Sequence, residues 1–182
     1  MTFVYGRPEN TEVRGVGGTQ GKPRPVTPPI SQWREAVREI RALVALPGKE
    51  AVTHIVGRWR KGKACLDREW LSEVFQLADG RELTYRQLEG QFSNPNAEVA
   101  KASLDWLCRI AKESIPPGTE LLELYSGFGH NTVALAPYFK HITSVEINRS
   151  LADMATFNLE INGIENAEVL RSPAEYVSTN IP

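Results

Sequence analysis

Short apolar runs and glycine turns alternate in the C-terminal half of the chain, and their order predicts a strand–helix–strand unit. Residues 121–125 form an apolar run typical of a buried strand, and Gly127 and Gly129 follow it in a tight turn. A helix is expected to begin near Asn131, and a second strand is expected over residues 142–147. Glycine lets the backbone come close to a ligand where a side chain would clash. The order is that of a nucleoside-binding βαβ unit.

Acidic residues on the two strands indicate which nucleoside this unit would bind. Glu146 lies 19 residues after Gly127, where its carboxylate can accept hydrogen bonds from ribose hydroxyls. A dinucleotide-binding turn requires a third glycine, but Thr132 occupies that position, which weighs against an NAD-type dehydrogenase. Glu123, the two glycines and Glu146 fit S-adenosylmethionine better, because this ligand carries no phosphate. On these residues alone, an α/β turn that binds no ligand is the alternative.

The patterns on either side of this unit extend it in both directions. Asn94 can cap a helix that is expected to run to about residue 113. A further helix over residues 149–162 should end at Gly163, and a third strand is expected over residues 167–170. The predicted fold class is therefore α/β, with the first three strands of a truncated Rossmann-like core.

The N-terminal half has a weaker pattern, which predicts a small α+β segment before this core. Residues 2–5 can form a short strand, and a helix is expected over residues 31–46. Residues 6–29 are rich in glycine, proline and threonine, which is typical of a linker or an insertion. Four short strands are expected after the helix, over residues 52–59, 65–67, 70–77 and 83–87.

Basic side chains gather in two places in this half. Arg34, Arg38 and Arg41 form a stripe on the predicted helix, and a basic cluster occupies residues 58–63. A solvated surface is the simpler interpretation of both. Trp59 beside the cluster keeps an RNA-binding interpretation open, because bases stack on aromatic rings.

Composition narrows the classes of protein further. The 182 residues carry a net charge of −1, so no global field attracts nucleic acid. Cys65 and Cys108 are far apart, which is neither a disulfide framework nor a metal pair, and no metal site is expected. This suits a soluble protein of a reducing compartment, either the cytoplasm or an organelle interior. No apolar run approaches the roughly 20 residues that span a membrane, so no membrane partner is expected.

Five segments within residues 53–177 carry a resemblance to a known family. They are Ile55-Val56-Gly57-Arg58 with Lys61 and Lys63, Leu66-Asp67, Tyr85-Arg86-Gln87-Leu88-Glu89, Phe92-Ser93-Asn94-Pro95-Asn96-Ala97 and residues 121–129. In these segments and their spacing the chain resembles the middle portion of the tRNA (uracil-5-)-methyltransferases, the bacterial-type enzymes that methylate a T-loop uridine. The resemblance implies S-adenosylmethionine as the cofactor, tRNA as the partner and a Rossmann-like methyltransferase core.

The resemblance also implies roles for residues near the glycine turn. Tyr125 matches the family's cofactor-contacting tyrosine, and Glu146 matches the acid that binds the ribose. Asn94 stands where the family usually has a glutamine that contacts the cofactor or the target base. His130 stands where it usually has an asparagine. The predicted cofactor-binding residues are Asn94, Tyr125, Gly127, Gly129, His130 and Glu146.

The family's catalytic residues have no match in this chain. In the family a cysteine attacks C6 of the uracil, and a glutamate later removes the C5 proton. Neither Cys65 nor Cys108 matches the nucleophile position, so no catalytic residue is predicted, and the chain by itself is not assigned a catalytic reaction. The first hypothesis is the S-adenosylmethionine-binding fragment of an RNA uracil-C5 methyltransferase. The alternative is a naturally truncated, non-catalytic subunit that acts through protein or RNA contacts, with a protein partner covering the open sheet edge at the third strand.

The predicted domain organisation combines these assignments. Residues 1–30 are expected to be a linker or an insertion, and residues 31–92 a partial α+β segment from the RNA-binding or central region of the family. Residues 93–182 are expected to be the N-terminal half of the methyltransferase domain.

Overall fold

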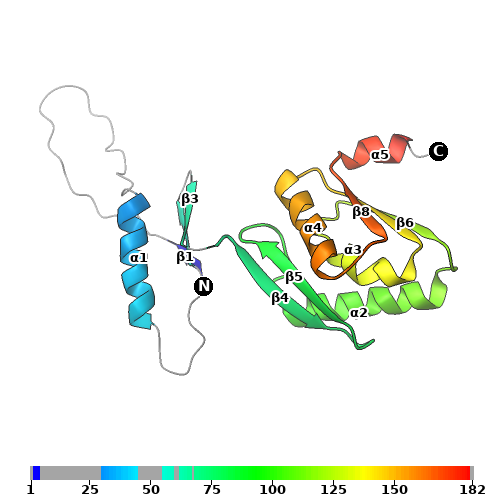
Figure 1. Ribbon diagram of the computed structural model, residues 1–182, viewed down its shortest axis with the longest axis horizontal. Coiled ribbons are helices and arrows are strands. Elements are labelled where there is room, and N and C mark those ends of the chain that lie inside the picture. The colour runs from blue at the N-terminus through cyan, green and yellow to red at the C-terminus, as the bar shows by residue number, and fades with distance from the viewer. Residues whose placement is uncertain (1, 5–29, 45–54, 60–61, 67, 181–182) are drawn as a thin grey trace, which may run out of the picture. The chain divides into compact units, whose positions relative to one another are not determined.

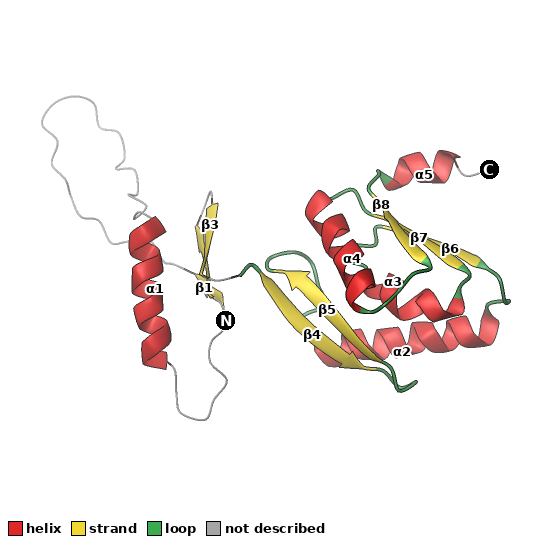
Figure 2. Cartoon of the chain, in the orientation of Figure 1, coloured by secondary structure: helices red, strands yellow, loops and turns green. Residues whose placement is uncertain are grey.

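The computed structural model forms two compact units, Met1–Glu69 and Trp70–Pro182 (Figures 1 and 2). The residues that it describes are 2–4, 30–44, 55–59, 62–66 and 68–180. The predicted linker over residues 6–29 lies outside these ranges. Within them, no helix is long and apolar enough to cross a membrane.

In the part of the N-terminal unit that the structure describes, one helix accompanies a small sheet. β1 (Thr2–Val4) pairs with β2 (Ile55–Trp59) in parallel, and β2 pairs with β3 (Gly62–Leu66) in the antiparallel sense. The helix α1 (Ile30–Val44) begins one residue before the predicted range and ends two residues before its predicted end. The predicted α+β character of this segment is therefore confirmed.

A glycine in β2 allows α1 to pack closely on this sheet. Trp33 and Val37 of α1 are buried and form a small core with apolar residues of β2 and β3. A Cβ atom on Gly57 would lie 2.5 Å from the Trp33 ring, which is well inside van der Waals contact. The close approach of the indole therefore requires glycine at this strand position.

The C-terminal unit begins with a β-hairpin. β4 (Trp70–Gln76) and β5 (Glu82–Leu88) pair in the antiparallel sense over their whole length. The turn between them is closed by the amide of Leu77, which donates to the carbonyl of Arg81 at 2.9 Å. Gly80 adopts a φ of +88°, a conformation that L-residues rarely take.

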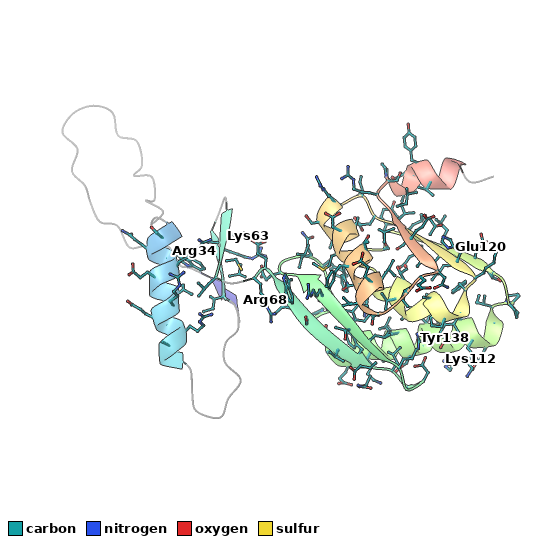
Figure 3. The ribbon with its side chains drawn as sticks, in the orientation of Figure 1. Arg34, Lys63, Arg68, Lys112, Glu120 and Tyr138 are labelled. Atoms are coloured by element: carbon teal, nitrogen blue, oxygen red, sulfur yellow. The ribbon has the colours of Figure 1, made fainter. Side chains whose placement is uncertain are left out.

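The side chain of Arg81 fixes this turn to the rest of the unit. Its guanidinium forms an ion pair with Asp79 at 2.7 Å and donates to the carbonyl of Ala134 at 2.9 Å. Tyr138, which Figure 3 labels, donates from its hydroxyl to Asp79 at 3.0 Å. The Arg81 hydrogen bond lowers the pKa of Asp79 to about 2, so this carboxylate stays ionised across the physiological range.

The helix after the hairpin, α2 (Ala97–Ser114), begins later than predicted. Asn96 caps it, because its side-chain oxygen accepts a hydrogen bond from the amide of Val99 at 3.1 Å. The prediction of Asn94 as the cap is therefore wrong. The Asn94 side chain instead accepts from the amide of Asn96 at 3.0 Å, which forms a turn that leads into the helix.

A three-stranded parallel sheet follows α2. The chain runs through β6 (Glu120–Leu124), α3 (His130–Leu135), β7 (His141–Val145), α4 (Arg149–Ile161) and β8 (Ala167–Leu170). The strand order is β6-β7-β8, and both pairings are parallel. This alternation confirms the predicted α/β, Rossmann-like class with its first three strands.

Two short helical segments complete the unit. A 3-10 turn, η1 (Ala136–Tyr138), continues α3, and α5 (Ala174–Asn180) follows β8. Within the described residues, β6 and β8 each pair only with β7, so they form the two edges of this sheet.

The hairpin shares its core with the helices of the C-terminal unit. Phe75, Leu83 and Tyr85 of the hairpin pack in one buried cluster with Leu104 of α2 and Leu159 of α4. The boundary between the compact units therefore lies before the hairpin, between residues 69 and 70. The predicted domain boundary lies after it, at residue 92, and the three-domain division stays a prediction.

Candidate functional site

Two glycines with left-handed backbone conformations shape the turn after β6. Gly127 has a φ of +60° and Gly129 a φ of +79°. The amide of Ser126 donates to the carbonyl of Val145 at 3.0 Å, which ties the turn to the end of β7. A Cβ atom on Gly127 would meet nothing within 4 Å, so there is open space beside the turn. The turn lies at the carboxyl end of a parallel sheet, where α/β folds commonly bind ligands.

Glu146 directly follows β7 and contacts this turn. One carboxylate oxygen accepts a hydrogen bond from the amide of Gly127 at 2.9 Å, and the other accepts from the amide of Asn148 at 2.8 Å. The side chain is only 8% exposed. A carboxylate can accept about four hydrogen bonds, so Glu146 retains acceptor capacity after these two. The structure thus brings the predicted Gly127 and Glu146 together.

Tyr125 lies at the same end of the sheet in a strained conformation. Its φ is +58°, and it is the sole non-glycine residue with a positive φ among the described residues. The ring is 68% exposed, and its hydroxyl donates to Glu175 of α5 at 3.0 Å. This contact raises the pKa of Tyr125. Strain of this kind is concentrated at functional sites.

The side chain of His130 packs into the core beneath the turn. Its ring stacks on Phe128 with centroids 5.5 Å apart and lies edge-on to Tyr85 at 5.0 Å. Burial lowers the pKa of His130 to about 4, so the imidazole is neutral at pH 7. Its Nε2 atom is buried without a hydrogen-bond partner. The structure therefore directs this predicted site residue toward the hairpin core.

Asn94 lies before α2, apart from the glycine turn in the sequence. It is exposed, and its side chain accepts the local hydrogen bond from the amide of Asn96. Across the described ranges, no hydrogen bond joins Asn94 to Tyr125, Gly127 or Glu146. Its predicted contact with the cofactor or the target base stays a prediction.

Three polar side chains behind the turn form buried hydrogen bonds that were not predicted. The hydroxyl of Thr132 donates to the Glu123 carboxylate, and it lies 2.9 Å from the hydroxyl of Ser144. Thr132 and Ser144 are fully buried, and burial raises the pKa of Glu123. The three side chains join β6, α3 and β7 directly below the turn. The available signal was Ser144, which lies two residues after Ile142 and therefore on the same face of the second strand.

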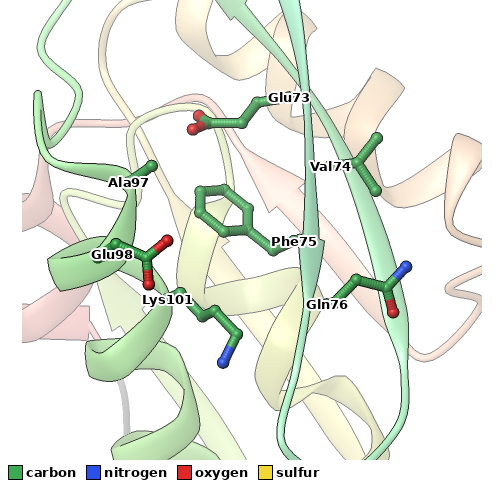
Figure 4. A pocket seen from close by; sticks show the side chains of 7 residues that line it. All are labelled: Glu73, Val74, Phe75, Gln76, Ala97, Glu98 and Lys101. Atoms are coloured by element: carbon green, nitrogen blue, oxygen red, sulfur yellow. The ribbon is translucent and has the colours of Figure 1, made fainter.

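A separate pocket of about 310 Å³ lies between β4 and the first turns of α2 (Figure 4). The Phe75 ring points toward α2 inside it, and Glu73, Glu98 and Lys101 contribute charged side chains. None of the residues lining it is a predicted cofactor residue. The pocket therefore does not coincide with the glycine turn.

The predicted basic surfaces belong to the N-terminal unit. Arg34 and Arg38 are exposed on α1, and Arg34 and Lys63 are labelled in Figure 3. Lys63 of β3 forms an ion pair with Glu69 at 2.6 Å, which offsets part of its charge. Contact between this unit and RNA stays a prediction.

A family model and two relatives indicate the same family. A family model described as tRNA (Uracil-5-)-methyltransferase matches residues 30–181. The tRNA/tmRNA (uracil-C(5))-methyltransferase of Azoarcus sp. (strain BH72) is 40% identical over 148 residues, which are 81% of this chain and 38% of that protein. The protein of the same name from Aromatoleum aromaticum is 39% identical over 146 residues, covering 80% of this chain and 37% of that protein.

The matched region is a limited part of these relatives. The chain spans 37–38% of the length of the two proteins. Among solved structures, a protein from Pyrococcus horikoshii matches 81% of this chain and 51% of its own chain, with a TM-score of 0.50 and 13% identity. Identity this low supports the α/β fold and nothing finer.

Proposed function

Because the chain belongs to the tRNA (uracil-5-)-methyltransferase family, we propose that it binds S-adenosylmethionine within an enzyme that methylates C5 of a tRNA uridine. The two relatives described above are tRNA/tmRNA (uracil-C(5))-methyltransferases. The observation that carries the cofactor part of this proposal is the contact of Glu146 with the amide of Gly127. It places a carboxylate beside a glycine turn at the carboxyl end of a parallel sheet.

The groups around the turn fit the nucleoside part of this cofactor. Glu146 would accept hydrogen bonds from the ribose hydroxyls, because two of its acceptor positions are already used by backbone amides and others remain. The open space beside Gly127 would admit the ligand close to the backbone. Tyr125 presents an exposed ring at the same end of the sheet. When bound, S-adenosylmethionine would supply an electrophilic methyl group on its sulfonium sulfur.

The chain's own cysteines do not suit nucleophilic attack on the uracil. Cys108 is buried in α2, and burial raises the pKa of its thiol. Its sulfur donates to the carbonyl of Ala134 and accepts from Arg81. Cys65 lies on β3 in the N-terminal unit. A thiolate is the reactive form, so a buried, hydrogen-bonded thiol is a poor nucleophile. We therefore assign cofactor binding to the residues around the glycine turn and leave the attack on C6 to groups other than these two cysteines.

The substrate part of the proposal is the T-loop uridine of tRNA. It rests on family membership and on the names of the relatives. The alternative of a non-catalytic subunit, with a protein partner along the edge of β8, is not favoured by any contact among the described residues.

Calorimetric titration of the 182-residue chain with S-adenosylmethionine and S-adenosylhomocysteine tests the cofactor part. Glu146→Gln should weaken binding by about tenfold or more, because charged hydrogen bonds contribute roughly 1.5–3 kcal/mol. Glu120→Gln is the matched control, since Glu120 lies at the opposite end of β6 in an exposed pair with Lys140. No binding by the unmodified chain, or equal affinity in both variants, would refute the proposal.

Methyl transfer tests the substrate part. The protein from its native source should transfer a labelled methyl group to an unmodified tRNA transcript. Replacing the T-loop uridine with cytidine should abolish the transfer, because cytidine at this position lacks the uracil O4 carbonyl. Undiminished transfer to the cytidine transcript would place the target elsewhere.

A further inference from the structure

Asn158 of α4 and Asn162, the residue directly after this helix, hold the edge of β5 that faces away from β4. The Asn158 side chain accepts from the amide of Arg86 at 2.8 Å and donates to its carbonyl at 3.0 Å. Asn162 does the same with Thr84, at 3.0 and 2.7 Å. Each side-chain amide thus pairs with both backbone groups of one strand residue, as a neighbouring strand would. The two asparagines attach the hairpin to α4.

Asn158 makes one contact that Asn162 lacks. Its Nδ2 atom also donates to the carbonyl of Phe128 at 2.9 Å. Phe128 lies between Gly127 and Gly129 in the turn. Asn158 is fully buried, so this hydrogen bond is out of contact with solvent. The second bond of the Asn162 amide instead goes to the carbonyl of Asn158, within α4.

Two side chains from different parts of the chain therefore hold the glycine turn, in addition to the backbone hydrogen bond of Ser126 to Val145. Glu146, after β7, binds the amide of Gly127, and Asn158 of α4 binds the carbonyl of Phe128. Glycine has more conformational freedom than any other residue, so a turn with two glycines keeps one shape only when its peptide groups are held. Removing either anchor frees part of the surface that would meet a ligand.

We propose that Asn158 is a positioning residue for S-adenosylmethionine binding. It fixes the Phe128 carbonyl and thereby the shape of the turn, and it couples the turn to the hairpin through Arg86. The inference rests on the proposed function, because it assumes that the cofactor binds at this turn. Asn158 acts through the turn and makes no contact with the ligand itself.

Asn162, the C-cap residue of the same helix, provides a matched control. Each of the two side chains pairs with its own residue of β5, but only Asn158 also contacts the turn. A purely structural role predicts that both alanine variants lose thermal stability while their affinities for S-adenosylmethionine stay alike. A positioning role predicts that affinity separates them. Calorimetric dissociation constants are therefore compared at a temperature where both variants are folded.

The expected result is asymmetric. Asn158→Ala should weaken S-adenosylmethionine binding about tenfold, because the turn must then lose conformational freedom on binding. Asn162→Ala should bind within about twofold of the unmodified chain. Equal affinities in the two variants would overturn the inference while the unmodified chain still binds. An unmodified chain that binds no S-adenosylmethionine would remove the proposed function as well, so the two failures are distinct.

A second measurement needs no variant and covers the case in which Asn158→Ala does not fold. In the ¹⁵N-labelled chain, saturating S-adenosylmethionine should shift the side-chain NH₂ resonances of Asn158, because their acceptor is part of the turn. The NH₂ resonances of Asn162, one helical turn further on, should stay in place. Unchanged Asn158 resonances in the presence of bound cofactor would overturn the inference.

Discussion

Alanine at Gly129 should destabilise the C-terminal unit far more than alanine at Gly127. Both glycines have a positive φ, which costs an L-residue roughly 1–2 kcal/mol. A Cβ atom on Gly129 would also lie 3.2 Å from the Cβ atom and 3.4 Å from the Cα atom of Ala155. Ala155 is fully buried in α4 and cannot move away freely. Overpacking of this kind adds roughly 1–3 kcal/mol.

The magnitudes separate the two variants. Gly129→Ala should lower the free energy of unfolding by about 2–5 kcal/mol, the strain and the overpacking together. Gly127→Ala should lower it by about 1–2 kcal/mol, because nothing lies within 4 Å of the added atom. Urea titration with hydrogen exchange in peptides from α3 and β7 as the readout reports the stability of the C-terminal unit separately from that of the N-terminal unit.

A double variant isolates the steric part of this prediction. Ala155→Gly removes the nearer of the two atoms, so in combination with Gly129→Ala it should restore about 1 kcal/mol or more relative to additivity. Equal destabilisation by Gly127→Ala and Gly129→Ala, or strict additivity of the pair, would refute the packing of α4 against the turn.

Three further predictions concern the hairpin, the core histidine and the strained tyrosine. The Arg86 guanidinium stacks between the rings of Trp70 and Phe157, with its Cζ atom 3.9 and 4.0 Å from the ring centroids. Arg86→Ala should therefore lower the free energy of unfolding by about 1–3 kcal/mol in urea titrations, and Arg86→Lys should lower it by less. Burial lowers the pKa of His130 from 6.5 to about 4, so the unfolded chain binds the proton more readily and stability falls as the pH drops through this range. The loss at pH 5 is about 2 kcal/mol relative to pH 7, and His130→Phe should remove that difference, which urea midpoints at the two pH values measure. Tyr125→Asn should raise the melting temperature, because asparagine tolerates a φ of +58°, yet weaken S-adenosylmethionine binding in a titration.

The elements around the glycine turn could be predicted because their signals are local. The expected strands over residues 142–147 and 167–170 match β7 and β8 to within two residues. Short runs of apolar and β-branched residues mark such strands without any knowledge of their partners. The pairing of Gly127 with Glu146 follows from the same logic, since the ends of adjacent parallel strands meet at one edge.

Contacts between distant segments could not be predicted in this way. Asn158 and Arg86 are 72 residues apart, and nothing in an amphipathic helix distinguishes an asparagine that binds a strand from one that faces water. The direction of the His130 ring depends on Phe75 and Tyr85 of the hairpin, whose packing against α3 is a tertiary property. The local sequence pattern therefore predicted the turn, whereas its contacts with distant segments became visible only in the folded structure.

Asn158 and the C-cap residue Asn162 can both pair with β5 because the spacing of residues four apart in a helix nearly equals that of residues two apart in a strand. Four residues of an α-helix rise about 6.0 Å, and two residues of an antiparallel strand rise about 6.8 Å. Asn158 and Asn162 can therefore face Arg86 and Thr84 with a mismatch below about 1 Å, which hydrogen bonds absorb. A third asparagine, four residues further along the helix, would double this mismatch. Side chains of one helix can therefore pair with two strand residues in this way and no more. Moving either asparagine by one position would rotate it about 100° around the helix and break its two hydrogen bonds to β5.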